Sequence, residues 1–473
     1  MTAVTTLGNG FEPLRGQLHT ELQARLPEHI ERLQWTHEQI ETAQRDGLRA
    51  LLAHAIEYSP FHRRRLGDIN PSRFDLSDLS RLPVMTKAEM MESLDDIFTD
   101  RRLNWALVEE ALAATTNEPV PILGEYTALA SGGVSGLRGV FVADSQARAD
   151  MILAALRPMM ARLASAGGPP SGGLTMAVVA AASAVHATGS IPAWAAAGDL
   201  PIRARAVPVT LPLPEIVDRL NALQPQLLYG YASMLARLAE EQRAGRLQIK
   251  PISVNSNSEM LSSGQRAAVA EAFGAPIVEG FGCSEGLMGN TAPNDRVFVF
   301  TSDLCIVELV DAEDQPVPLG VPSARVLLTN LYNRIQPLIR YQLMDNFVRQ
   351  PDAPDHGHLR ATVRGRADEL LRYDGVDVHP LVVRSVMVRS PAILDYQVRQ
   401  TPRGIDVDTL AVVPVDCAHL ADQLSRALAE AGLHDPAVTV RLVDRLERLP
   451  DTGKVRRFLP LAEQAAGERA APR

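Results

Sequence analysis

The stretch Ala275-Pro276-Ile277-Val278-Glu279-Gly280-Phe281-Gly282-Cys283-Ser284-Glu285-Gly286 decides the class of fold. Its first four residues are a short apolar run that predicts a buried strand, and the glycines predict a turn at the strand's end. Phe281, Ser284 and Glu285 follow at once. Open α/β sheets bind ligands beyond the carboxyl ends of their strands, where an aromatic face, a hydroxyl and a carboxylate suit a nucleotide and Mg²⁺. An ordinary strand-to-loop turn with a solvated Glu is the alternative.

Similar runs precede this stretch. Residues 174–180, 227–231 and 252–255 each predict a strand, and predicted helices alternate with them. This alternation indicates an α/β fold with a parallel or mixed sheet. We expect a large N-terminal domain of mixed β-sheets packed with helices, followed by a small α+β C-terminal domain.

The predicted domain boundary lies at Asp368. Residues 1–367 form the large domain, of which 1–100 are a helical lead-in, and residues 368–473 form the small domain. Within the lead-in, Thr86 is predicted to cap a helix, with Glu89 three residues later.

Composition limits the class of protein. The chain has 473 residues, 22% of them charged, and a net charge of -9, which disfavours a nucleic-acid or anionic-membrane partner. Met1–Gly16 lacks the pattern of a signal peptide, and three scattered cysteines fit a reducing cytoplasm. The uncharged stretch Gly172–Gly198 is rich in small residues and holds His186 and Pro192, so it predicts a buried strand and loop rather than a membrane span.

A second candidate site is the Gly- and Ser-rich segment from Ser131 to Gly139, which precedes a strand-like run at 140–142. Such loops present free backbone N–H groups and can cradle phosphates. It lacks the Gly-Lys-Ser/Thr ending of a Walker loop, and a plain hairpin is the alternative.

Lysine is scarce, since only Lys87, Lys250 and Lys454 occur among 47 basic residues. A lysine retained in such a chain indicates a place that requires a compact point charge. His186 follows an apolar run, and a partly buried structural histidine is its alternative reading. His356 and His358 flank a glycine and predict a tight turn, because no third metal ligand lies nearby in the sequence.

Taken in order, these motifs resemble the adenylate-forming superfamily of acyl-CoA synthetases, luciferases and nonribosomal adenylation domains. The phrases Tyr58-Ser-Pro-Phe61, Leu82-Pro-Val-Met-Thr-Lys87 and Gly375-Val-Asp-Val-His-Pro380 are similar to the phenylacetate–CoA ligase subgroup. The resemblance covers nearly the whole chain. It implies a ligase that uses ATP, Mg²⁺ and CoA and contains a mobile small domain.

The resemblance also implies a role for each matching residue. Glu285 would bind Mg²⁺ beside the phosphate-facing Ser284, and Asp345 with Arg366 would hold the ribose hydroxyls. Phe281 would lie against the adenine, and Ser258 and Glu259 would line the adenine pocket. Gly282 is a further cofactor-binding candidate and could also border the acid. The residues of the phosphate loop would be Ser131, Gly132, Gly133, Ser135, Gly136 and Arg138.

Further roles concern the acid and the domain motion. Lys454 would bridge the substrate carboxylate and the α-phosphate, His186 would lie beside that carboxylate, and Asp368 would be the hinge of the small domain. Strand-end residues predicted to line the acid pocket are Tyr229, Gly230, Ala187 and Trp194. The sequence departs from the family at Phe281, where Tyr is usual, at Arg138, one position from the usual Lys, and at 342–344 before Asp345.

The expected activity is ATP-dependent adenylation of a small, aromatic or similar carboxylic acid, with transfer to the CoA thiol. Two alternatives stay open. One is a biosynthetic (secondary-metabolism) enzyme that passes an activated acid, or an oxyacid such as nitrite, to an amine, a carrier protein or a reductase. The other is a non-catalytic nucleotide-binding relative. A homodimer is also open.

Overall fold

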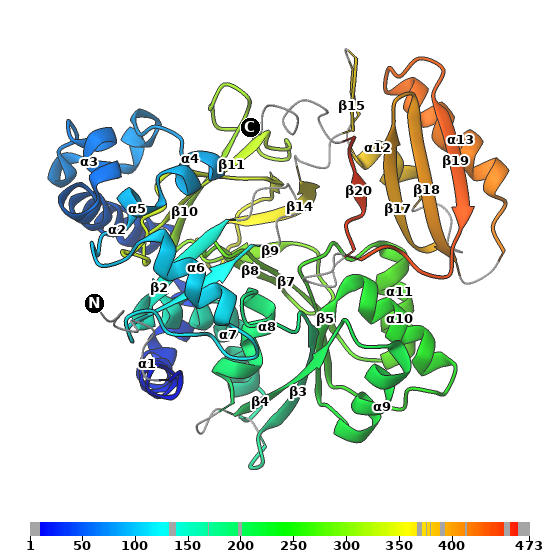
Figure 1. The fold of residues 1–473 in the computed structure, drawn as a ribbon, viewed down its shortest axis with the longest axis horizontal. Helices are drawn as coiled ribbons and strands as arrows, with labels where there is room; N and C mark the ends of the chain where they lie inside the picture. Colours follow the sequence, from blue (N-terminus) through cyan, green and yellow to red (C-terminus); the bar gives the residue numbers. More distant parts are fainter. Residues whose placement is uncertain are drawn as a thin grey trace, which may run out of the picture.

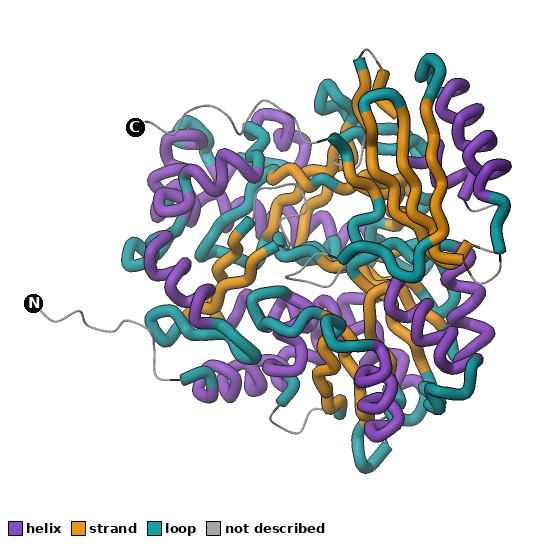
Figure 2. Tube along the Cα trace, turned by 45° about the vertical axis from the view of Figure 1, so that its right-hand side comes forward, coloured by secondary structure: helices purple, strands orange, loops and turns teal. Residues whose placement is uncertain are grey.

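The computed structural model describes residues 10–131, 139–168, 170–196, 201–366, 371–374, 376–378, 380–387, 393–411, 414–448 and 455–461. Figure 1 shows a large body, drawn in blue to yellow, and a smaller sheet with its own helices, drawn in orange and red. Figures 1 and 2 agree that the smaller sheet stands beside the large body, with a helix on its outer face.

The largest sheet among the described residues has nine strands in the order β13-β14-β9-β8-β7-β6-β5-β3-β4. Strands β4, β3, β5, β6 and β7 are parallel, and from β7 to β13 the pairing is antiparallel. Its strands are β3 (Leu174–Ala180), β4 (Ile202–Pro208), β5 (Leu227–Tyr231), β6 (Ser253–Asn257), β7 (Ile277–Gly282), β8 (Met288–Thr291), β9 (Phe298–Phe300), β13 (Asp345–Arg349) and β14 (Arg360–Arg366).

The parallel half is built from strands whose apolar side chains are almost all buried, as expected when helices cover a sheet. One core cluster joins β3, β4 and β5 to the helices that follow them. The helices of the large body are α1 (Glu12–Glu31), α2 (His37–Tyr58), α3 (Pro60–Leu66), α4 (Lys87–Glu92), α5 (Leu94–Ile97), α6 (Trp105–Ala114), α7 (Ser145–Ser165), α8 (Ala187–Trp194), α9 (Leu213–Leu223), α10 (Ala232–Arg243) and α11 (Ser263–Phe273).

Two smaller sheets complete the large body. Strands β1 (Tyr126–Ala130) and β2 (Val140–Asp144) form an antiparallel hairpin. Strands β10 (Cys305–Val310), β11 (Arg325–Asn330) and β12 (Tyr341–Leu343) form a three-stranded sheet. The N-terminal lead-in is tied to it, because Met85 donates to the carbonyl of Arg340 and accepts from the amide of Gln342. The lead-in therefore reaches the site described below.

The C-terminal part has a separate core. Strands β15 (Leu371–Tyr373) and β16 (Val376–Val378) pair with each other, while β17 (Ile393–Thr401), β18 (Gly404–Ala411), β19 (Ala437–Leu442) and β20 (Phe458–Leu459) form a sheet in the order β19-β18-β17-β20. They pack with α12 (Pro380–Met387) and α13 (Cys417–Glu430), and this cluster contains only residues from Leu371 to Phe458.

The predicted class, α/β with a large mixed-sheet domain and a smaller α+β domain, is confirmed. Thr86 caps α4 by accepting from the amide of Glu89, as predicted. One strand was predicted to end too early. The strand expected to end at Val278 continues to Gly282, because residues 280–282 pair with β8.

Two further predictions concern single segments. Gly172–Gly198 was predicted as strand and loop, but after β3 it also forms α8. No helix in the described part of the chain is long and apolar enough to cross a membrane. Nε2 of His358 lies 2.8 Å from the carbonyl oxygen of Arg32. The described residues contain no cluster of three or more side chains that could hold a metal ion.

Candidate active site

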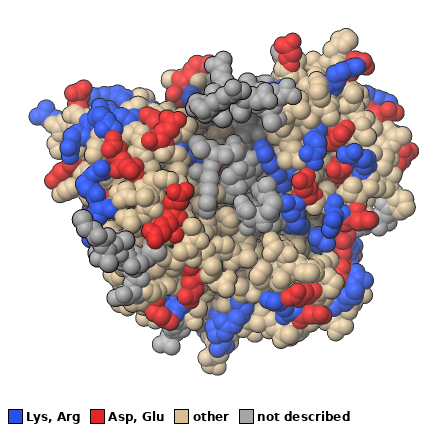
Figure 3. Space-filling view, viewed as in Figure 1, with Lys and Arg blue, Asp and Glu red and all other residues tan. Residues whose placement is uncertain are grey.

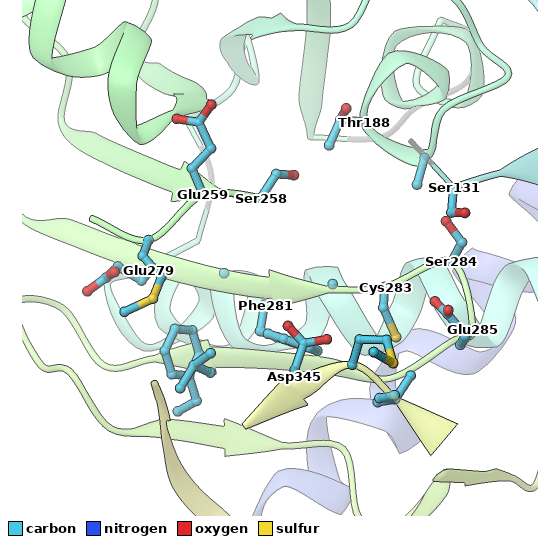
Figure 4. Close-up of a pocket in the computed structure, with 18 of the residues that line it drawn as sticks. Ser131, Thr188, Ser258, Glu259, Glu279, Phe281, Cys283, Ser284, Glu285 and Asp345 are labelled. Carbon is cyan, nitrogen blue, oxygen red and sulfur yellow. The ribbon is translucent and has the colours of Figure 1, made fainter. Parts of the chain in front are cut away.

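A cavity of about 590 Å³ lies where the end of β7 meets β12, β13, α8 and the C-terminal segment 455–457. This volume suits a small-molecule ligand. Figure 4 shows Ser131, Ser284 and Glu285 toward one end of the cavity and Glu259 and Glu279 toward the other, with Phe281 and Asp345 between them. Segments far apart in the sequence therefore meet at one place.

Phe281 is held rigidly on the cavity wall. Its ring makes edge contacts with Phe300 at 5.5 Å and Phe347 at 5.2 Å between centroids, and those two rings stack at 4.7 Å. Phe281 itself is half-buried and lines the cavity. This arrangement offers a fixed aromatic surface to a flat ligand group.

Two glycines let the chain approach its neighbours closely. A Cβ atom on Gly280 would lie 2.0 Å from Oδ1 of Asn257. Gly286 has φ +106°, and a Cβ there would lie 2.2 Å from Nδ2 of Asn330 and 2.3 Å from the hydroxyl of Tyr332. These two side chains donate to the carbonyls of Glu285 (Asn330, 2.9 Å) and Gly286 (Tyr332, 2.8 Å), so they fix the backbone at the carboxylate.

Glu285 is the carboxylate best placed for a metal ion. It is 9% exposed, lines the cavity beside Ser284, and its Oε1 lies 3.4 Å from the hydroxyl of Tyr341. Mg²⁺ is commonly held by one or two carboxylates together with substrate phosphates, so a single buried carboxylate next to a serine hydroxyl fits this ion.

The predicted phosphate loop connects β1 to β2. Ser131 lines the cavity, donates its amide to the carbonyl of Gly139 and accepts the amide of Gly139 on its hydroxyl, both at 2.8 Å. The segment is thus anchored at both ends by a hairpin. Five predicted loop residues lie outside the described residues: Gly132, Gly133, Ser135, Gly136 and Arg138.

The predicted ribose pair is adjacent in the sheet. Asp345 begins β13 and lines the cavity, and Arg366, at the end of β14, is its register partner. The structure describes the backbone of Arg366 but not its side chain. The backbone pairing brings the two residues to one edge of the site.

His186, Ala187 and Thr188 bring the start of α8 to the cavity. His186 Nδ1 lies 3.3 Å from the carbonyl of Ala130, on the strand that leads into the hairpin loop. Thr188 shares a hydrogen bond of 2.9 Å with the hydroxyl of Tyr231, which also accepts the amide of Ala181. Burial raises the pKa of Tyr231 to about 12, so this hydroxyl stays protonated.

Three residues predicted for the acid pocket do not line this cavity. Trp194 is buried at the far end of α8, with its ring against Phe11 at 4.5 Å. Tyr229 packs against the core of the parallel sheet, and a Cβ on Gly230 would meet Leu235 and the carbonyl of Val179 at 3.3 Å.

Other predicted residues that line the cavity are Gly282, Ser258 and Glu259. Lys454 and Asp368 lie outside the described residues.

Several cavity residues were not predicted, among them Thr188, Arg296, Arg457 and Lys87. Lys87 was noted for its rarity, and the Met85 pairing that carries it to the site has no local sequence signal. Figure 3 shows basic and acidic side chains spread over both parts of this face.

Comparison with known proteins finds relatives that are similar in sequence and others that are similar in fold. No family model matches the chain. A phenylacetate-coenzyme A ligase of Thermus thermophilus is 27% identical over 377 residues, covering 76% of this chain and 77% of that protein. The structure of 2-hydroxyisobutyryl-CoA ligase in the postadenylation state, in complex with R3-HIB-AMP, matches with a TM-score of 0.66 at 18% identity, over 90% of each chain. In its thioesterification state the same ligase matches with a TM-score of 0.52 at 19% identity, over 89% of each chain.

The chain therefore has the fold of the adenylate-forming ligases and is similar in sequence to phenylacetate-coenzyme A ligases.

Proposed function

We propose that this protein is an AMP-forming acid–thiol ligase. It activates a small carboxylic acid with ATP as an acyl-adenylate and then transfers the acyl group to the thiol of CoA. The similarity to a phenylacetate-coenzyme A ligase over three quarters of the chain supports this activity. The identity of the acid is left to the experiment below.

The observation that carries the proposal is the convergence at one cavity. Ser131, His186, Asp345 and the pair Phe281 and Glu285 come from four separate segments and line the same 590 Å³ space. The aromatic wall, the hydroxyls of Ser131 and Ser284, the buried carboxylate of Glu285 and the half-buried one of Asp345 together suit a nucleotide with its phosphates better than an apolar ligand.

The first half-reaction is attack of the substrate carboxylate on the α-phosphate, with pyrophosphate leaving. A carboxylate needs no general base, so the chain's task is positioning and charge neutralisation. Phe281 would hold the adenine, Asp345 with Arg366 the ribose, and Ser131 with Ser284 the phosphates. Glu285 would hold Mg²⁺, which when bound neutralises phosphate charge.

Lys454 would stabilise the charge that develops between the carboxylate and the α-phosphate. His186 would lie beside the substrate carboxylate at the start of α8. In the second half-reaction the small domain would turn and withdraw Lys454, leaving room for the thiol. The boundary of that domain is proposed at Asp368, because the core cluster of the C-terminal part begins at Leu371.

Pyrophosphate release tests the proposal. ATP and Mg²⁺ are combined with a panel of aromatic, aliphatic and amino acids, first without and then with CoA. Acid-dependent release stimulated by CoA supports the ligase. If CoA does not stimulate pyrophosphate release, the acceptor is a compound other than CoA. If no acid gives pyrophosphate release, the protein does not adenylate carboxylic acids.

A further inference from the structure

Glu259 connects two parts of the molecule that belong to different cores. Its Oε2 accepts the amide of Ser233, at the start of α10 in the large body, at 2.8 Å. Its Oε1 accepts the amide of Val455, in the C-terminal segment, at 2.9 Å. Each carboxylate oxygen therefore binds one backbone N–H, and hydrogen bonds to an ionised acceptor are among the stronger ones.

The backbone before Glu259 is shaped for these contacts. Ser258 has φ +66°, a left-handed conformation that non-glycine residues adopt rarely. Figure 4 shows the carboxylate of Glu259 pointing away from Phe281. Although Glu259 borders the cavity, its oxygens are engaged by protein N–H groups.

Residues 455–457, which include the amide bound by Glu259, contact strand β17 of the C-terminal sheet. Arg457 is 9% exposed, pairs with Asp395 of β17 at 2.7 Å and lies over the ring of Tyr396 at 5.3 Å. Its carbonyl also accepts the amide of Val398 at 2.7 Å. A contact at Val455 is therefore two residues from side-chain and backbone contacts to β17.

A second hydrogen bond lies beside the first. Nη1 of Arg457 donates to the carbonyl of Met260, the residue after Glu259, at 3.3 Å. Residues 259–260 of the large body thus supply two acceptors, and residues 455–457 supply two donors.

We propose that Glu259 is a positioning residue that holds the C-terminal part in the arrangement used for adenylation. The proposal rests on the proposed function, in which Lys454 acts in the first half-reaction only. The amide nitrogen of Val455 is bonded to the carbonyl carbon of Lys454, so a contact to that amide acts on the residue assigned to adenylation. The second half-reaction requires the same contact to break.

The comparison of shapes agrees with this assignment. The chain matches 2-hydroxyisobutyryl-CoA ligase with a TM-score of 0.66 in its postadenylation state and 0.52 in its thioesterification state, at nearly equal coverage. The Glu259 contacts are thus present in an arrangement nearer the first of these states.

Glu259→Gln tests the role with two independent readouts. The amide keeps one acceptor oxygen but turns an NH₂ group toward the other N–H, so one contact is lost. We expect hydrogen exchange of the Val455 amide, followed by mass spectrometry of a peptide spanning it, to become ~10-fold faster, the factor for a lost hydrogen bond to a charged group. Exchange in β17 and β18 reports that the sheet itself is intact.

The kinetic readout separates the half-reactions. Pyrophosphate release should slow by a similar factor of ~10, while transfer to CoA from a preformed acyl-adenylate should stay within about twofold. The matched control is Glu240→Gln on α10, the same chemical change at a carboxylate that does not line the cavity. It should leave both readouts unchanged.

Two outcomes would overturn the role: unchanged exchange at Val455, or equal slowing of both half-reactions. If Glu259→Gln does not fold, Arg457→Lys replaces it, because lysine keeps a charge for Asp395 but lacks the second nitrogen that reaches Met260. It must likewise slow adenylation alone. Failure of the wild-type protein to release pyrophosphate would contradict the proposed function, while the exchange measurement would still decide the contact.

Discussion

The hydroxyl of Tyr341 lies 3.4 Å from Oε1 of Glu285, so the candidate metal ligand is oriented by a fully buried phenol on the neighbouring sheet. Tyr341 begins β12, and Glu285 follows β7. The orientation of the Glu285 carboxylate therefore depends on a contact between two sheets. That contact is present in the protein without substrate.

Replacing Glu285 by Gln should raise the Mg²⁺ requirement. The neutral amide keeps the shape but loses the charge that a hard cation prefers, so we expect the half-saturating Mg²⁺ concentration for pyrophosphate release to rise by about tenfold or more. Tyr341→Phe is the matched control, because it keeps the carboxylate and removes one weak hydrogen bond. It should shift the Mg²⁺ requirement by no more than about fivefold. An unchanged requirement in Glu285→Gln would remove Glu285 from the metal site.

Lys454→Ala should separate the two half-reactions. Loss of the compact charge should slow acyl-adenylate formation by about 10²–10³-fold, the effect of removing one preorganised charge-stabilising group. Transfer from a preformed acyl-adenylate should be nearly unaffected. Lys250→Ala, another of the three lysines, is the control because it does not line the cavity. Equal losses in both half-reactions would contradict the assigned role.

Gly280→Ala should reduce stability, because its Cβ would lie 2.0 Å from Oδ1 of Asn257. Overpacking of this kind costs ~1–3 kcal/mol, to be measured as a loss in the free energy of unfolding. The double variant Asn257→Ala/Gly280→Ala removes the clashing atom, so it should recover most of the loss relative to Asn257→Ala alone. Strict additivity of the two single changes would show that the clash is not the cause.

Two strands of the parallel sheet, β3 and β5, could be predicted from the sequence, because they are short apolar runs buried on both faces. Residues 174–180 were predicted with the bounds that the structure gives, and residues 227–231, predicted as a strand passing into a turn, are strand throughout. The end of β7 was not predicted, since its last residues carry glycines and are held by β8, a partner that local pattern does not reveal.

The candidate site divides in the same way. Phe281, Ser284 and Glu285 stand next to each other in the sequence, so one strand end predicts all three. Thr188 with Tyr231, and Glu259 with Val455, are joined only by folding, and neither pair has a spacing that sequence alone could detect. Trp194 shows the opposite case. It is close in sequence to the cavity residues His186 and Thr188, but it lies at the other end of α8 and its side chain is buried in the core.

Protonation of His62 should lower the free energy of unfolding in mild acid. His62 is 1% exposed on α3, its Nε2 lies 3.0 Å from the carbonyl of Pro337, and burial lowers its pKa from 6.5 to about 4. Between these values the unfolded chain binds a proton that the folded protein does not. Stability is therefore fully present above pH 6.5 and falls as the pH drops toward 4, by up to ~3 kcal/mol at about 1.36 kcal/mol per pKa unit. Melting temperatures measured from pH 7.5 to 4.5 should show this loss in the wild-type protein and less of it in His62→Gln, whose amide can still donate to Pro337. The exposed His434→Gln serves as control, and parallel pH profiles for all three proteins would show that His62 is not the group responsible.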